Sequence, residues 1–199
     1  MLIVIEGCVG AGKSTVAKGL ASYRTSDPLL ETFEVNPFLR AFYEDSVKNV
    51  IETEFAFLLV HFHQLKNQAD AASKKEIIAD FHLGKDLLYA DLNIKDTRTR
   101  RIFGDLYDLC LEKTPPVGLM IYLSATTELL LERIRRRKRD FELEIDPGYY
   151  AGVNQAYESF FESYSGKKLR LSMSEWDFVK NPSLFDKLSI LVDKELKAV

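Results

Sequence analysis

A short stretch near the amino terminus has the residue types and spacing of a phosphate-binding loop. Residues 7–14 read GCVGAGKS, which fits the pattern G-x-x-x-x-G-K-[ST], and they lie between an apolar run and an amphipathic stretch. Glycines let such a loop curl so that its N–H groups and the start of the next helix point at phosphate oxygens. We expect Lys13 to offset charge on the β- and γ-phosphates and the Ser14 hydroxyl to reach Mg²⁺. The residues expected to bind the nucleotide are Gly7, Gly10, Ala11, Gly12, Lys13, Ser14 and Thr15.

A phosphate-binding loop does not identify the group that accepts the phosphate. GTPase switches, motor ATPases and small-molecule kinases all share it, and a chance glycine-rich turn between strand and helix is the structural alternative. The 199 residues contain no N-K-x-D tetrapeptide of the kind that reads guanine, which weakens the GTPase interpretation. Small kinases are therefore the leading class.

The elements that must position this loop follow from four apolar runs that alternate with amphipathic segments. Such alternation is typical of buried parallel strands joined by crossover helices. We expect strands at residues 1–6, 76–80, 118–123 and 168–173, and helices at residues 12–24, 36–44, 47–75, 86–113, 126–138, 148–164 and 182–196. The pattern predicts an α/β domain with a mostly parallel sheet. Because no repeat or linker interrupts the chain, residues 1–199 are expected to form one domain.

The composition argues against several classes of protein. There are 27 Lys plus Arg and 30 Asp plus Glu, and the net charge of −3 offers no overall attraction to nucleic acid or to an anionic membrane. The apolar runs are far shorter than the ~20 residues that cross a bilayer. Cys8 and Cys110 have no Cys or His at metal-ligand spacing, so we expect reduced thiols. These features predict a cytoplasmic protein that binds neither nucleic acid nor membrane.

Three motifs resemble those of the deoxynucleoside kinase family. Residues 31–45, ETFEVNPFLRAFYED, resemble its acceptor-site motif, in which an acid precedes N-P-[FY]-L-x-x-F-Y. Residues 137–142, RKRDFE, followed by Tyr149, resemble its arginine-rich lid, and residues 121–125 resemble the strand that leads to the lid. The match extends from residue 1 to about residue 161.

The resemblance implies a fold, a reaction and partners. The fold would be a P-loop NTPase-type parallel sheet of about five strands, flanked by helices and carrying an arginine-rich lid. The reaction would transfer the γ-phosphoryl group of ATP to the 5′-hydroxyl of a deoxyribonucleoside, with Mg²⁺. Members of the family usually pair through long helices, which implies a homodimer.

A carboxylate near the acceptor would take the proton that the attacking hydroxyl loses. By its match to the family's acid, Glu31 is the candidate catalytic base, and Glu34 is the nearby alternative. Tyr43 matches the family's tyrosine that hydrogen-bonds the sugar 3′-hydroxyl. An aromatic residue at this spacing from Phe38 also suits a core position.

Asp80 ends the second apolar run, at the edge of a parallel sheet where ligands bind. It matches the acid of the family's D-R-S or E-R-S motif and is expected to hold Mg²⁺ or to orient a water on it. The next two positions depart from the family, because Phe81 and His82 replace the arginine and the serine. Lys85, four residues after Phe81, could return the missing charge beside the acceptor. Some bacterial members carry an aspartate, an aromatic residue and a following lysine here, which favours substitution over inactivity.

The basic run at residues 133–139 suits phosphoryl transfer, since guanidinium groups can meet charge spread over the phosphoryl oxygens. Its ordinary explanation is a solvated basic helix end. By their match to the lid, Arg137 and Arg139 are expected to clamp the transferring group, and Glu142 to reach the sugar. Phe141 stands where many relatives have a second acid. The other arginines of the run, expected to face solvent or to pack, are Arg133, Arg135 and Arg136.

Base recognition is predicted from one helical position. Glu54 stands where the family commonly has a glutamine, and Phe57 and His61 follow one and two turns along the same face as possible walls of a base pocket. A glutamine can satisfy thymine N3–H and O4 together, whereas an ionised carboxylate only accepts. We therefore expect purine deoxynucleosides or deoxycytidine to be favoured over thymidine. The alternative is that Glu54 is a solvated helix acid.

Two other functions remain open at this point. A nucleoside monophosphate kinase of the thymidylate kinase type has a similar loop and lid, but must hold an acceptor phosphate with arginines. Only one arginine, Arg40, lies between Phe33 and Asp80, which favours an uncharged acceptor. The second alternative is a regulatory protein that binds nucleotide without catalysis, which the loss of the arginine at Phe81 would explain.

Overall fold

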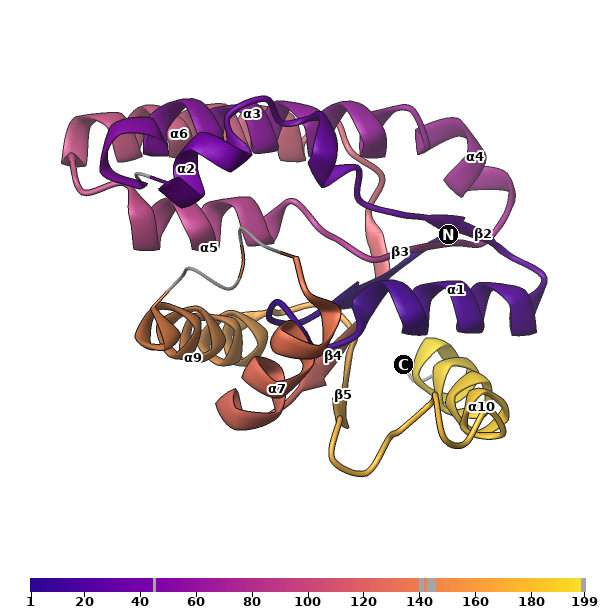
Figure 1. Ribbon diagram of the computed structural model, residues 1–199. Helices are drawn as coiled ribbons and strands as arrows, with labels where there is room; N and C mark the ends of the chain where they lie inside the picture. The colour runs from indigo at the N-terminus through magenta and orange to yellow at the C-terminus, as the bar shows by residue number, and fades with distance from the viewer. Residues whose placement is uncertain (45, 140–141, 143–145, 198–199) are drawn as a thin grey trace.

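The computed structural model describes residues 1–44, 46–139, 142 and 146–197. A sheet of five parallel strands lies at its centre, in the order β2-β3-β1-β4-β5 (Figure 1). The strands are β1 (Leu2–Glu6), β2 (Asp27–Leu29), β3 (Ile77–Ala79), β4 (Val117–Ser124) and β5 (Lys168–Ser172). The predicted α/β class and parallel sheet are confirmed.

Helices flank this sheet, together with one short 3-10 helix, η1 (Phe33–Val35). The described helices are α1 (Lys13–Arg24), α2 (Leu39–Glu44), α3 (Ser46–Lys66), α4 (Ala69–Lys74), α5 (Gly84–Asn93), α6 (Thr97–Leu111), α7 (Thr127–Arg137), α9 (Pro147–Ser163) and α10 (Leu184–Lys197). Helix α1 packs on β1, β2 and β3, and α10 packs on α1, β4 and β5. Figure 1 shows α3 and α6 side by side, with α5 beneath them, and these three helices pack on one another. None of the described helices is long and apolar enough to cross a membrane.

Three elements differ from the sequence expectations. Strand β2 was not expected, because two of its three residues are exposed and the third is only half-buried, so it shows no apolar run. The helix expected over residues 47–75 is two helices, α3 and α4, and the helix expected over residues 86–113 is α5 and α6. Asp96 starts α6 by accepting a hydrogen bond from the backbone N–H of Thr99 (2.8 Å). The cap at Asp96 thus starts α6 as a separate helix, although the hydrophobic pattern of the sequence continues without a break.

The carboxyl ends of three neighbouring strands meet at one edge of the sheet. The phosphate loop follows β1, the segment that begins at Leu30 follows β2, and Asp80 follows β3. The backbone N–H of Asp80 donates to the carbonyl of Leu29 (3.1 Å), so the second and third segments are joined directly. Parallel sheets bind their ligands at such an edge.

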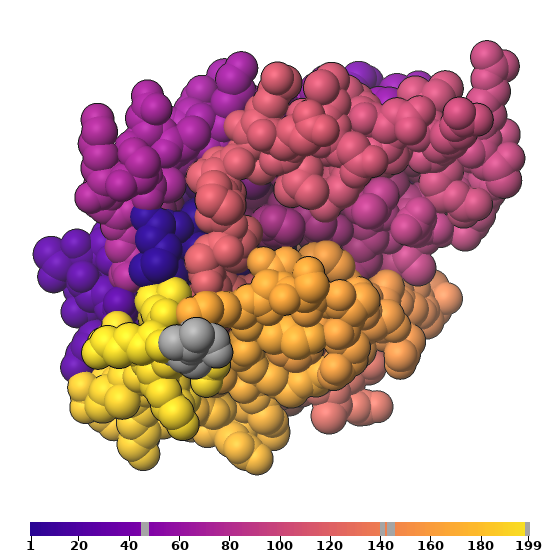
Figure 2. All heavy atoms as spheres, turned by 180° about the vertical axis from the view of Figure 1, so that it is seen from behind, coloured from indigo at the N-terminus to yellow at the C-terminus, as the bar shows by residue number. Residues whose placement is uncertain are grey.

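The amino terminus is held beside α4. The α-amino group of Met1 donates to the carbonyls of Ala72, in α4, and of Lys75. Figure 2 shows the first residues, in indigo, next to the purple residues of α4.

Candidate active site

The loop after β1 has the conformation that its glycines permit. Gly10 and Gly12 have φ angles of +86° and +101°, in the left-handed region that favours glycine. A Cβ at Gly10 would also lie 2.9 Å from the carbonyl oxygen of Leu130. Gly12 is the N-cap of α1, which begins at Lys13, so the N–H groups of the first helical turn face the loop. The ammonium of Lys13 donates to the carbonyl of Gly7 (2.6 Å), and burial lowers the pKa of Lys13.

A cavity of about 490 Å³ extends from this loop toward α3, α5 and the end of α7. Most residues that the sequence singles out line it, although they come from distant parts of the chain. They are Gly10, Gly12, Lys13, Ser14, Thr15, Glu31, Tyr43, Glu54, Phe57, Asp80, Lys85, Arg137, Arg139 and Glu142. Two expected residues lie beneath the surface of the cavity: Gly7 and Ala11 are buried in the loop itself.

Asp80 connects the loop to the segment that follows β2. One carboxylate oxygen accepts from the hydroxyl of Ser14 (2.5 Å), and the other accepts from the backbone N–H of Glu31 (2.7 Å). In the described part of the chain no three His, Cys, Asp or Glu side chains form a metal cluster. A hydroxyl beside a carboxylate still suits Mg²⁺, which in nucleotide sites takes few protein oxygens and completes its shell with phosphates and water.

The carboxylate of Glu31 contacts two basic side chains, those of Lys85 and His61. The ammonium of Lys85 lies 2.7 Å from its Oε1, and Nε2 of His61 lies 3.1 Å from the same oxygen. Burial alone would raise the pKa of Glu31, but Lys85 and His61 outweigh it and hold that pKa well below its usual range. Glu34, the alternative acid, also borders the cavity but is exposed to solvent. The geometry therefore favours Glu31 over Glu34 as the candidate catalytic base.

The position of His61 corrects one expectation. Phe57 lines the cavity as predicted, but His61 is fully buried behind the cavity wall and forms no part of it. Its Nδ1 contacts the carboxylate of Asp86 (2.7 Å), a buried residue of α5 that the sequence analysis did not single out. The signal available was weak, because Asp86 is one more acid at the start of a predicted helix.

A second buried acid was also missed. Glu6 closes β1, and its carboxyl accepts from the backbone N–H groups of His82 (2.6 Å) and Gly7 (3.3 Å). Burial raises the pKa of Glu6 to about 7, against the opposing effect of nearby lysines. His82 itself accepts from the backbone N–H of Gly84 (3.0 Å), and burial lowers its pKa to about 4. His82 is thus a neutral, packed histidine.

The expectation that Glu54 is ionised at neutral pH is wrong. Its side chain is buried, and Oε1 accepts a hydrogen bond from the amide of Asn93 (2.7 Å). Burial raises the pKa of Glu54 to about 8, and the negative charge of Asp86 adds to the rise. Near pH 7 the group is mostly protonated, so it offers one donor and one acceptor as a glutamine does.

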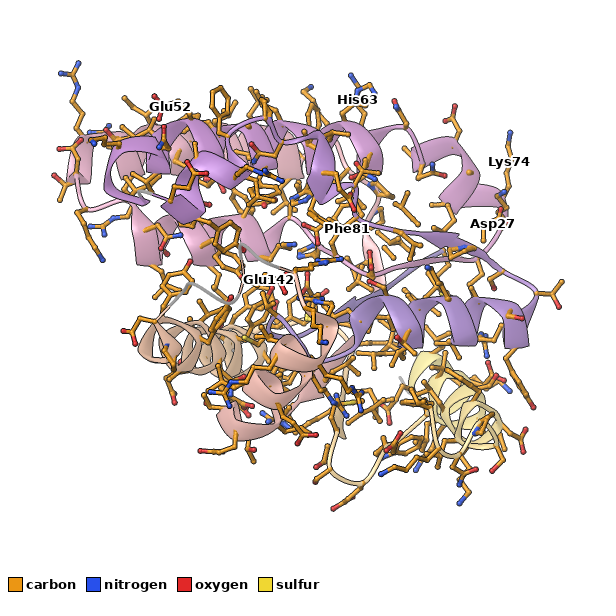
Figure 3. All side chains as sticks on the ribbon, viewed as in Figure 1. Asp27, Glu52, His63, Lys74, Phe81 and Glu142 are labelled. Atoms are coloured by element: carbon orange, nitrogen blue, oxygen red, sulfur yellow. The ribbon has the colours of Figure 1, made fainter. Side chains whose placement is uncertain are left out.

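The residues expected to form the lid line the cavity and contact one another. Arg137 makes three contacts of 2.5, 2.6 and 3.1 Å with the carboxylate of Glu142, and Arg139 contacts the same carboxylate at 3.2 Å. The guanidinium of Arg139 also lies 4.2 Å above the ring of Phe33. Glu142 is buried, and Figure 3 shows it in the region between α5 and α9. Asp140 and Phe141 lie outside the described residues.

The remaining arginines of the basic run divide as expected. Arg135 and Arg136 are exposed. Arg133 packs under the phosphate loop, where it donates to the carbonyls of Ala11 (2.9 Å) and Met173 (3.4 Å). Arg133 therefore supports the loop from below.

Comparison with known proteins gives consistent matches. The sequence model of the family described as deoxynucleoside kinase matches residues 3–197. The deoxyguanosine kinase of Bacillus subtilis (strain 168) is 30% identical over 201 residues, covering 98% of this chain and 96% of that protein. The deoxyadenosine kinase of Lactobacillus acidophilus is 28% identical over 215 residues, covering 100% of this chain and 97% of that protein. The solved structure of deoxyadenosine kinase from M. mycoides with bound dCTP superposes with a TM-score of 0.80 at 28% identity, over 95% of this chain and 99% of that one.

Proposed function

The chain belongs to the deoxynucleoside kinase family, and we propose that it transfers the γ-phosphoryl group of ATP to the 5′-hydroxyl of a deoxyribonucleoside. Deoxynucleoside phosphorylation itself follows from the family and from the relatives, so the chain is a phosphotransferase with a nucleoside alcohol as acceptor. The phosphate donor, the position of the accepting hydroxyl and the preferred base are part of this proposal.

One observation carries the assignment of roles. The carboxylate of Asp80 contacts both Ser14 of the phosphate loop and the backbone of Glu31. A nucleotide phosphate on the loop and a hydroxyl beside Glu31 would therefore meet at Asp80. Positioning of this kind supplies most of the catalysis in phosphoryl transfer, because the protein does little covalent chemistry.

In this mechanism Glu31 is the base. As the 5′-oxygen of the acceptor bonds to the γ-phosphorus, the bond from that phosphorus to the bridging oxygen breaks and ADP leaves with the bonding pair. The acceptor proton passes to Glu31. Lys13 offsets charge on the phosphates, and Arg137 and Arg139 exchange Glu142 for the phosphoryl oxygens when both substrates are bound.

Mg²⁺ would be held by the hydroxyl of Ser14 and the carboxylate of Asp80, either directly or through water. Bound there, the ion would neutralise charge on the nucleotide phosphates.

The acceptor is proposed to be uncharged. Within the described lining of the cavity the arginines are Arg137 and Arg139, and Glu142 already pairs with both of them. Because the mechanism assigns both arginines to the transferring phosphoryl group, no arginine of the described lining is left for an acceptor phosphate, which argues against a nucleoside monophosphate kinase. Relatives named as deoxyguanosine, deoxyadenosine and deoxyadenosine/deoxycytidine kinases support a purine deoxynucleoside or deoxycytidine over thymidine.

We further propose that residues 1–199 act as one kinase domain that pairs as a homodimer in the cytoplasm. The two cysteines are free thiols, in keeping with a reducing compartment. The packed helices α3 and α6 carry apolar side chains that are 45% to 52% exposed and would suit a second copy. These residues are Ile51, Leu59, Ile102 and Leu109. Light scattering of the wild type and of Leu59→Glu tests the pairing, which requires a dimer that the substitution weakens.

An ATP consumption assay tests the reaction. The purified protein is supplied with each of the four deoxynucleosides, their ribose counterparts and the monophosphates. We expect turnover with at least one deoxynucleoside and little with monophosphates. Lys13→Ala should abolish that turnover while leaving the melting temperature nearly unchanged, because the lysine acts on ligand charge. Turnover with monophosphates alone would overturn the proposed acceptor.

A further inference from the structure

A buried histidine bridges two acids beside the acceptor site. Nδ1 of His61 lies 2.7 Å from Oδ1 of Asp86, and Nε2 lies 3.1 Å from Oε1 of Glu31. The three residues come from α3, α5 and the segment after β2. His61 has no exposed surface, so it cannot contact a substrate and can act only through its partners.

The contacts require a charged ring. A neutral imidazole has one N–H donor and one lone pair, and here its lone pair would face a carboxylate oxygen at close range. An imidazolium donates from both nitrogens and satisfies both acids. With Lys85 included, the buried group carries two positive and two negative charges, so its net charge is zero.

The two cations select one oxygen of Glu31. Lys85 and His61 both contact Oε1, at 2.7 and 3.1 Å. Oε2 has no hydrogen bond to any residue that the structure describes, and Glu31 borders the cavity. A carboxylate held in this way cannot rotate freely, and its free oxygen is the one available to an acceptor hydroxyl.

We infer that His61 is a positioning residue for phosphoryl transfer: anchored by Asp86, its imidazolium holds Oε1 of Glu31 so that Oε2 takes the proton of the acceptor. The inference rests on the proposed role of Glu31 as the base. This role of His61 also accounts for Phe81, which stands where the family has an arginine. The ring of Phe81 packs on the imidazole, with the two ring centroids 4.9 Å apart. The positive charge that an arginine would bring from that position comes instead from α3 and α5, and an aromatic ring supports it.

A double-mutant cycle tests the coupling. We expect His61→Gln to lower kcat about tenfold or more with the KM for ATP changed less than about twofold, and Glu31→Gln to lower kcat about 10²-fold or more. In the double variant, the loss should be close to that of Glu31→Gln alone, because His61 acts through that residue. His63→Gln is the matched control, since His63 is two residues further on α3 and points outward (Figure 3); its kcat should equal that of the wild type.

The pH profile gives a second readout that a merely structural role would not change. Burial would lower the pKa of His61, but Asp86 and Glu31 outweigh it and raise the pKa to about 9. The other groups facing the ring are Lys85 on α5, whose pKa the neighbouring acids raise, and Glu54 on α3, the helix of His61 itself, whose pKa burial raises to about 8. The kcat should therefore fall as the pH passes about 9, and His61→Gln should remove that fall, whereas any dependence on the ionisation of Glu54 near pH 8 should persist.

The outcomes distinguish a wrong base from a wrong role for His61. If Glu31→Gln keeps wild-type turnover, both the proposed base and the role of His61 are overturned. If Glu31→Gln loses turnover but the losses of the two single variants multiply in the double variant, only the positioning role is overturned. Should His61→Gln not fold, nitrogen NMR of the wild type decides the matter at pH 7.5: both ring nitrogens protonated supports the inference, and a neutral ring overturns it.

Discussion

Base selection by Glu54 should depend on pH. The buried carboxyl has a pKa of about 8, so about 3% is ionised at pH 6.5 and about 90% at pH 9. The contact from Asn93 marks Oε1 as the carbonyl oxygen of the neutral form, so the proton is expected on Oε2, and Glu54 lines the cavity. Loss of that proton changes a donor–acceptor pair into two acceptors.

The two forms suit different bases. Adenine presents an amino donor beside the N1 acceptor, which matches only the neutral form. Guanine can match the neutral form through O6 and N1–H, but it also presents two adjacent donors, N1–H and the 2-amino group, which match the ionised form. One mispaired buried polar contact costs ~1–3 kcal/mol, or about tenfold to a hundredfold in specificity. The ratio of kcat/KM for deoxyguanosine to that for deoxyadenosine should therefore rise about tenfold or more between pH 6.5 and 9. Thymine, with one donor and one acceptor, groups with adenine, so Glu54 disfavours thymidine only above its pKa.

Steady-state kinetics at the two pH values check this prediction. In Glu54→Gln the ratio should stay at its low-pH value throughout, because the amide does not titrate. Glu52→Gln is the control, since Glu52 lies one half-turn away on α3 and points into solvent (Figure 3); its ratio should follow the wild type. A wild-type ratio that does not change with pH would refute the reasoning and place base selection elsewhere.

Three other predictions follow from the same contacts. Arg137→Ala and Arg139→Ala should each lower kcat more than ATP affinity, since their partner is charge that develops in the transition state; equal losses in kinetics and nucleotide binding would contradict this. Gly19→Ala should destabilise the protein by about 1–3 kcal/mol in urea unfolding, because a Cβ there would overlap the ring of Phe185 on α10, which would have to move from its packed position. The folded-state pKa of Glu54 exceeds its unfolded value of 4.5, so the folded state binds the extra proton and its stabilising effect is lost as the pH rises from about 4.5 through 8. Melting temperatures over that range should consequently rise in Glu54→Gln relative to the wild type as the pH increases, and a constant difference would count against the raised pKa.

The amino-acid sequence was sufficient for the features that depend on neighbouring residues. The phosphate loop is contiguous, and its glycines, lysine and hydroxyl act through the backbone that carries them. The apolar runs predicted four of the five strands, because a buried parallel strand needs apolar side chains on both faces. Asp80 could be placed at the sheet edge for the same reason, since it directly follows such a run.

Other features depended on contacts between distant segments. Strand β2 is short and exposed, so only its pairing with β3 makes it a strand. The protonation of Glu54 follows from burial, which a helical pattern with polar neighbours does not reveal. His61, Asp86 and Glu31 are separated by up to 55 positions (31 to 86), and their charges acquire meaning only when α3, α5 and the segment after β2 meet. Sequence spacing predicts which side chains share a helix face, but the protonation state of a group depends on the solvent and charges around it, and those are decided by the tertiary packing.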